Sequence, residues 1–109
     1  TRLPDYDMDL YFHKKMKVTP ESALVYLREA YPVLRDLPEF TQSAIHDAMM
    51  SLVEKLGIKN GQLLYPLRVA LSGTPVTPGG AIEIAYLLSR HEALSRIETG
   101  IRKLEDSLQ

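Results

Sequence analysis

The sequence predicts an all-α protein, an irregular bundle of five or six short helices. Apolar residues recur every three or four positions along most of the chain, and no segment of useful length alternates like a half-buried strand. The stretches between the periodic segments are short, so neighbouring helices are expected to pack closely. With 109 residues, 45% of them hydrophobic, the chain fits one helical domain over residues 1–109 with one modest core.

The first strong helix is expected to begin after Thr19. Threonine is a good N-cap, and Pro20 suits the first helical position. Apolar residues then follow at helical spacing as far as Leu34, although Pro32 should end or kink the helix. A weaker helix is expected before it, over residues 8–16.

Two further helices have clear stop signals. A regular apolar stripe follows Thr41 and ends at Gly57, which is a typical C-terminal stop. After a turn at residues 59–61, a shorter stripe of leucines ends at Gly73. The sequence therefore predicts a pair of helices joined by a short connection.

The stretch at residues 74–80 is the densest turn-forming segment of the chain. Thr77 is expected to cap the next helix, with Pro78 at its first position. That helix, over residues 81–88, is nearly all apolar and is expected to be buried on most sides.

The last helix is expected over residues 91–108. Glu92 and Arg96 are four positions apart and should form an ion pair on its exposed side. Together the helices are expected to bury one core. Its predicted members are Leu27, Ile45, Leu52, Leu67, Ile84, Leu94 and Ile101.

The composition excludes several classes of protein. The formal net charge is −1, from 13 basic and 14 acidic residues, whereas a free-standing nucleic-acid binder is usually basic. A local contact made by a domain tethered to a larger binder stays open. The chain has no cysteine, which excludes disulfides and Cys-ligated zinc. No apolar run approaches the roughly 20 residues that span a bilayer, so no membrane contact is expected.

No catalytic or metal site is expected. The acidic run at residues 5–9 resembles the start of a calcium loop, but the sixth and twelfth positions of that loop hold Leu10 and Met16. His46 has no further ligands at metal-binding spacing. The basic run at residues 14–17 is most simply a solvated one. No nucleophile arrangement and no phosphate-loop lysine is recognisable.

The region around Arg68 is more informative. Arg68 lies about 100° round its helix from the core-facing Leu67 and can reach solvent. Gly79 and Gly80 leave the first N–H groups of the next helix uncovered. Such a helix start beside an arginine is a plausible site for an anion or a base edge. The alternative is a tight structural turn with Arg68 paired to a surface carboxylate.

Two segments in this region, YPLRVALSG at 65–73 and TPGGAIEI at 77–84, resemble a known family. They are similar to the C-terminal anticodon-binding domain of bacterial glutamyl-tRNA synthetases, which are class I enzymes. The segments PDYD at 4–7, LPEFT at 37–41 and LGIKNG at 56–61 resemble further parts of that domain. The resemblance therefore covers nearly the whole chain.

The resemblance implies a helical cage that grips the anticodon loop of glutamate tRNA and positions that tRNA for ATP-dependent aminoacylation. One departure is the Gly79-Gly80 doublet, where some family members have one glycine followed by larger apolar residues. The residues that the resemblance places against the first two anticodon bases are Arg68, Thr77, Pro78, Ala81 and Ile82.

The resemblance also implies that ligation belongs to a larger parent enzyme, of which this chain is a C-terminal fragment. ATP and magnesium would be used by the parent's catalytic domain, and no cofactor is expected in this one. The partners implied are glutamate tRNA and the upstream domains, in a cytoplasmic monomer. A free-standing helical protein-interaction module is the alternative, and an independent hydrolase is a distant third. The coding sequence upstream of Thr1 would discriminate between them.

Overall fold

The computed structural model describes residues 2–109 and contains a short 3-10 helix followed by four α-helices. Within this range no strand is present, although His13 and Val18 form an isolated antiparallel bridge. The all-α class is confirmed, but the predicted count of five or six helices is too high. The elements are η1 (Met8–Tyr11), α1 (Pro20–Arg35), α2 (Gln42–Leu56), α3 (Asn60–Ser72) and α4 (Ala81–Ser107).

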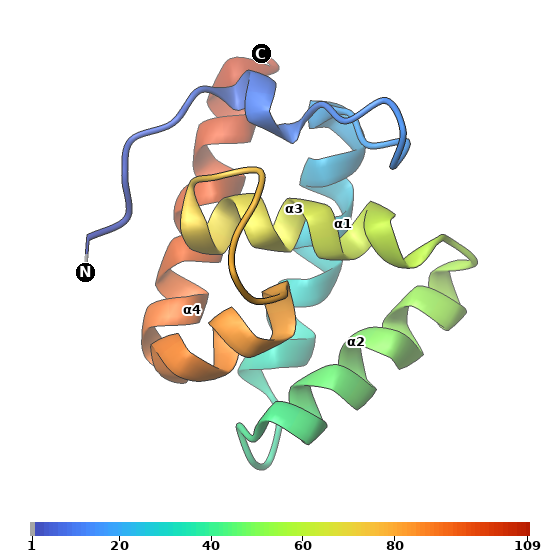
Figure 1. The fold of residues 1–109 in the computed structure, drawn as a ribbon. Helices are drawn as coiled ribbons and strands as arrows, with labels where there is room; N and C mark the ends of the chain where they lie inside the picture. The colour runs from blue at the N-terminus through green and yellow to red at the C-terminus, as the bar shows by residue number, and fades with distance from the viewer. Residues whose placement is uncertain (1) are drawn as a thin grey trace.

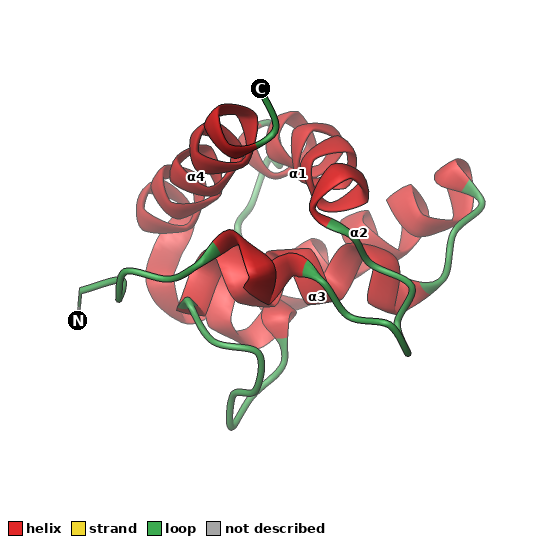
Figure 2. Ribbon diagram, turned by 90° about the horizontal axis from the view of Figure 1, so that it is seen from above, coloured by secondary structure: helices red, strands yellow, loops and turns green. Residues whose placement is uncertain are grey.

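The long helix α4 and the helix α1 lie side by side, and α3 crosses both of them (Figure 1). Seen from above, α3 forms a second layer beneath this pair, and α2 extends to one side (Figure 2). Helix α2 packs against all three of the other α-helices. The result measures 34 × 34 × 26 Å along its principal axes.

Local sequence signals explain where α1 begins but not where it ends. The Thr19 hydroxyl accepts a hydrogen bond from the Ser22 N–H (3.1 Å), and the Ser22 hydroxyl accepts one from the Thr19 N–H (3.0 Å). The helix then runs past Pro32 to Arg35, so the proline does not end it. Pro32 sits in the last turn, where its missing N–H removes a single bond of the helix.

The boundaries of α2 and α3 follow the predicted stop signals. The Thr41 hydroxyl caps α2 by accepting from the Ala44 N–H (3.1 Å). Gly57 (φ 68°) and Gly73 (φ 71°) both end their helices in the left-handed conformation that glycine adopts without strain.

The segment before α1 differs from the prediction. Of the weak helix expected over residues 8–16, only the single 3-10 turn of η1 forms, with Tyr11 fully buried. Asp7 caps this turn by accepting from the Asp9 N–H (2.9 Å). The remaining residues form a tight turn closed by the bridge between His13 and Val18, because one buried tyrosine does not give a helix an apolar face.

Helix α4 spans both predicted helices, over 81–88 and 91–108, and kinks between them. They are separated by one non-helical residue, Ser89, with φ 75° and ψ 163°. The first half was expected to be buried on most sides, but Leu87 is 72% exposed. This half packs through its small residues Ala81 and Ala85, so only one narrow face is covered.

One contiguous core joins all the elements. Four of the seven predicted core residues are buried, namely Leu27, Ile45, Leu52 and Leu67. The other three, Ile84, Leu94 and Ile101, are only partly buried against it. No helix over residues 2–109 has both the length and the apolar character to cross a membrane.

Candidate functional site

Arg68, in the C-terminal half of α3, is the strongest candidate for ligand binding. Its neighbours Leu67 and Val69 are buried, whereas Arg68 is half-buried. Its Nε atom is buried and has no hydrogen-bond partner within the described part of the chain. A buried donor left in this state costs about 1–3 kcal/mol, which a bound acceptor would offset.

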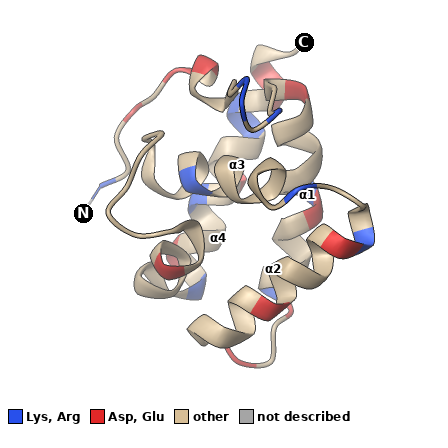
Figure 3. Cartoon of the chain, turned by 45° about the vertical axis from the view of Figure 1, so that its right-hand side comes forward, with Lys and Arg blue, Asp and Glu red and all other residues tan. Residues whose placement is uncertain are grey.

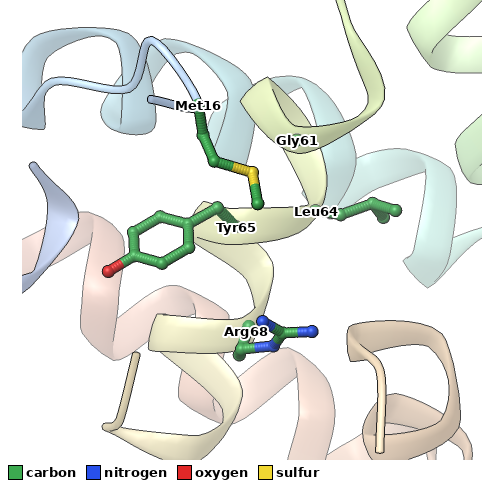
Figure 4. A pocket seen from close by; sticks show the side chains of 5 residues that line it. All are labelled: Met16, Gly61, Leu64, Tyr65 and Arg68. Atoms are coloured by element: carbon green, nitrogen blue, oxygen red, sulfur yellow. The ribbon is translucent and has the colours of Figure 1, made fainter. Parts of the chain in front are cut away.

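Arg68 forms one wall of a pocket of about 230 Å³ (Figure 4). The other walls come from Met16, Gly61, Leu64 and Tyr65. Leu64 and Arg68, one turn apart, point to the same side of α3, while Met16 reaches over from the turn before α1 (Figure 4). Apolar walls with one planar cation suit a flat ring that carries hydrogen-bond acceptors at its edge.

Tyr65 is held firmly as a wall of this pocket. Its hydroxyl donates to the Leu10 carbonyl (2.7 Å), and the His13 ring meets it edge-on at 4.8 Å between ring centres. Burial raises the pKa of Tyr65, and the charge of Arg68 opposes this less strongly, so the phenol is neutral at physiological pH. Sequence reasoning missed Met16 and Tyr65 as site residues because only tertiary packing brings them together.

The loop between α3 and α4 differs from the sequence expectation. The Thr77 hydroxyl donates to the Gly79 carbonyl within the loop and does not cap α4. The N-cap is Gly80, without a side-chain cap, and the helix starts at Ala81. Pro78 is exposed and lies before the helix, not at its first position. Thr77 fails as a cap because its hydroxyl is used to close the preceding turn.

The N-terminus of α4 has no side-chain cap, as Gly79 and Gly80 predict, but a carboxylate lies beside it. The carboxylate of Glu83, in the first turn, comes within 2.7 Å of where a Cβ at Gly79 would stand. A carboxylate there complements the positive end of the helix dipole and competes with any bound anion. This end of the loop therefore suits a base edge better than a phosphate.

Of the five residues predicted to contact RNA, only Arg68 lines the pocket. Thr77 and Ile82 are half-buried, and Pro78 is exposed, so each of these presents some surface to a ligand. Ala81 is only 4% exposed and offers almost none.

A second arginine, Arg96, has a structural environment. It was expected on the wet side of its helix, but only 7% of the residue is exposed. Its Nη1 donates to the Leu71 carbonyl (2.7 Å) at the end of α3, and its Nε donates to Glu92 (2.9 Å). The hydrogen bond from Arg96 lowers the pKa of Glu92. The predicted ion pair is thus confirmed. The prediction that Arg96 is exposed is wrong, because its guanidinium is buried against the C-terminal end of α3.

The other polar groups considered from sequence have partners within the fold. Asp5 pairs with Lys103 (3.0 Å), and His46, whose side chain is 58% exposed, pairs with Asp47 (3.1 Å). Over residues 2–109 no three His, Cys, Asp or Glu residues come together in a way that could hold a metal ion.

Comparison with known proteins places these features in a family. The family model described as an anticodon binding domain matches residues 1–101. The glutamate–tRNA ligase of Clostridium novyi (strain NT) is 46% identical over 97% of this chain, and that of Clostridium acetobutylicum is 47% identical over 94%. These alignments cover 22% and 21% of the two enzymes, so the chain spans about a fifth of their length.

A solved structure has the same fold. It is a crystal structure of a glutamate tRNA ligase from Elizabethkingia meningosepticum CCUG26117 in complex with its amino acid. The two align with a TM-score of 0.78 and 26% identity, over 94% of this chain and 20% of the ligase. Because the family model also matches nearly the whole sequence, this chain belongs to the anticodon-binding domain family.

Proposed function

We propose that this chain binds the anticodon loop of glutamate tRNA, as the anticodon-binding part of a glutamate–tRNA ligase. The observation that carries the proposal is the half-buried guanidinium of Arg68, with its partnerless Nε, beside an apolar pocket. It lies in a domain of the anticodon-binding family whose relatives are glutamate–tRNA ligases.

Each predicted site residue has a role that matches its surroundings. The planar fork of Arg68 hydrogen-bonds the edge of an unstacked base, as proteins commonly read single-stranded loops. The exposed ring of Pro78 and the half-buried Ile82 offer apolar surface for stacking. Thr77 shapes the loop through its bond to Gly79. Ala81, which is nearly buried, contributes backbone and not side-chain contact.

The domain positions tRNA for chemistry that takes place elsewhere. The glutamate, ATP and magnesium of aminoacylation are proposed to bind other parts of a cytoplasmic, monomeric parent enzyme. The relatives contain this domain as about a fifth of a longer ligase, which favours this proposal over a free-standing interaction module.

The test is Arg68→Ala, compared with Arg102→Ala, which removes an exposed arginine from α4. The ligands are RNA hairpins with the native anticodon of glutamate tRNA, or with its first or second base changed. They are titrated at low salt, because a chain with a net charge of −1 attracts phosphates weakly and salt weakens that attraction further. Arg68→Ala should weaken native binding by about 1–3 kcal/mol and reduce discrimination between hairpins. Its melting temperature should change by a few degrees at most.

Two results would contradict this role. An equal loss of affinity for native and altered hairpins would make Arg68 a phosphate contact and not a base reader. A large fall in melting temperature would make it a structural arginine. Arg102→Ala should leave both the affinity and the discrimination close to those of the unmodified chain.

A further inference from the structure

The turn between η1 and α1 concentrates positive charge. Three of its four residues at 14–17 are lysines, and all three are exposed. In Figure 3 this turn is blue over most of its length, whereas the loop between α3 and α4 carries no charge. A chain with a net charge of −1 therefore has a local cationic surface here.

The turn is fixed in place. Backbone bonds join His13 N to the Val18 carbonyl (2.9 Å) and Val18 N to the His13 carbonyl (3.0 Å). The Met16 N–H donates to Nδ1 of His13 (3.1 Å), and Lys17 adopts the left-handed conformation with φ 60°. The thioether of Met16 packs so closely over Gly61 that a side chain there would displace it.

The lysines of this turn have no acidic partners. Ion pairs elsewhere join Arg28 to Glu105 and Lys103 to Asp5, yet within residues 2–109 none involves Lys14, Lys15 or Lys17. Their charges are thus available to an external anion.

The pocket beside Arg68 indicates which kind of anion the lysines would meet. Met16 lines that pocket and lies between Lys15 and Lys17 in the turn. The backbones of both lysines are therefore next to a residue that forms the pocket wall. The pocket volume of about 230 Å³ is below the roughly 300 Å³ at which sites for whole drug-sized ligands begin. A single flat ring fits, and the sugar and phosphates attached to it would remain outside, at the lysines.

We propose that the turn at residues 14–17 holds the sugar–phosphate backbone of the nucleotide whose base enters the Arg68 pocket. This inference rests on the proposed function. The lysines contribute affinity that is independent of sequence, while Arg68 reads the base. Met16 joins the two parts, because the same turn that carries the lysines supplies one apolar wall of the pocket.

The test replaces Lys14 and Lys15 together by glutamine. Lys17 is left unchanged because its backbone is in the left-handed conformation. The matched control is Lys55→Gln with Arg102→Gln, which removes two exposed charges from α2 and α4. Affinity for the native anticodon hairpin is measured over a range of salt concentrations. Removing one lysine–phosphate pair should reduce the slope of log affinity against log salt by about 0.7–0.9.

We expect the Lys14/Lys15 variant to show a slope shallower by about 1.5, to bind more weakly at low salt, and to keep the unmodified preference between native and altered hairpins. Slopes that are equal for this variant and the control would overturn the inference, while an effect of Arg68→Ala would still uphold the proposed function. Absence of hairpin binding by the unmodified chain would overturn both. Lysine-dependent binding to phosphatidylserine vesicles, with RNA binding unaffected, would assign the turn to a membrane instead.

Discussion

Arg68 on α3 and Arg96 on α4 are chemically identical, and their surroundings separate their roles. Arg96 is 7% exposed and donates to Leu71 and Glu92. Arg68 is half-buried, and its Nε has no partner within the described part of the chain. An arginine whose donors are used internally stabilises the fold, whereas one with a buried, unused donor keeps a hydrogen bond that a ligand could accept, which is why Arg68 is the one proposed to bind RNA.

Replacing Arg96 by methionine should therefore destabilise the domain. Methionine keeps an apolar stem but leaves the Leu71 carbonyl without its donor, which costs about 1–3 kcal/mol. Urea unfolding followed by circular dichroism measures this change. Arg102→Met, on the exposed face of the same helix, is the control and should stay within about 0.5 kcal/mol of the unmodified chain. Equal unfolding midpoints for the two variants would show that the hydrogen bond to Leu71 adds nothing.

The sequence separates these two arginines only in part. Helical spacing correctly places Arg68 off the buried stripe, since it lies about 100° from Leu67. The same reasoning places Arg96 in solvent and is wrong, because the end of α3 packs over α4 and supplies an acceptor from a distant part of the chain. Met16 as a wall of the Arg68 pocket is equally invisible, since it depends on how one turn packs on α3.

At the scale of elements, local signals predict boundaries well where one residue determines them. Thr19, Thr41, Gly57 and Gly73 all act as the sequence indicates. Thr77 does not, because a threonine near a helix start can equally bond within the preceding turn, and short-range pattern does not distinguish the two. The expected gap after residue 88 exists as a kink in α4 at one strained residue, Ser89.

That strained residue leads to a prediction about α4. Ser89 has φ 75° and ψ 163°, in a region of backbone conformations that is essentially reserved for glycine. Ser89→Gly should relieve this strain and raise the free energy of unfolding by about 1 kcal/mol. Ser95→Gly is the matched control, because Ser95 is exposed within the regular part of α4. There, glycine should lower stability by a few tenths to about 1 kcal/mol. If the melting temperatures of both variants shifted in the same direction, the proposed strain at Ser89 would be contradicted.

At the scale of the whole molecule, polar contacts tie distant segments to α4. Asp5, near the start of the chain, pairs with Lys103 at 3.0 Å. Lys103 also lies over the ring of Tyr6, with its Nζ 4.7 Å from the ring centre. Arg90 donates to the carbonyls of Leu34 (3.1 Å) and Arg35 (3.0 Å) at the end of α1. No periodicity predicts these contacts, because their partners are far apart in sequence.

Carboxylates that pair with basic side chains should make the folded domain sensitive to acid. The hydrogen bond from Lys103 lowers the pKa of Asp5, that from Arg35 lowers the pKa of Asp36, and that from Arg96 lowers the pKa of Glu92. A carboxylate whose pKa is lower in the folded chain than in the unfolded chain stabilises the fold above its unfolded pKa, near pH 4. That stabilisation is lost as the pH falls through the folded value.

The melting temperature should therefore be nearly level from pH 7 to about pH 5 and should fall steadily below about pH 4. Glu92→Gln removes one of the three groups but keeps an oxygen that can accept from Arg96, so its melting temperature should fall less steeply over the acid range. Glu39→Gln removes an exposed carboxylate that, within residues 2–109, forms no ion pair, and should reproduce the unmodified curve. If the melting temperatures of the unmodified chain and both variants fell in parallel with pH, the Glu92–Arg96 pair would have no part in acid unfolding. That would hold even though Arg96 Nε and Glu92 Oε2 lie 2.9 Å apart.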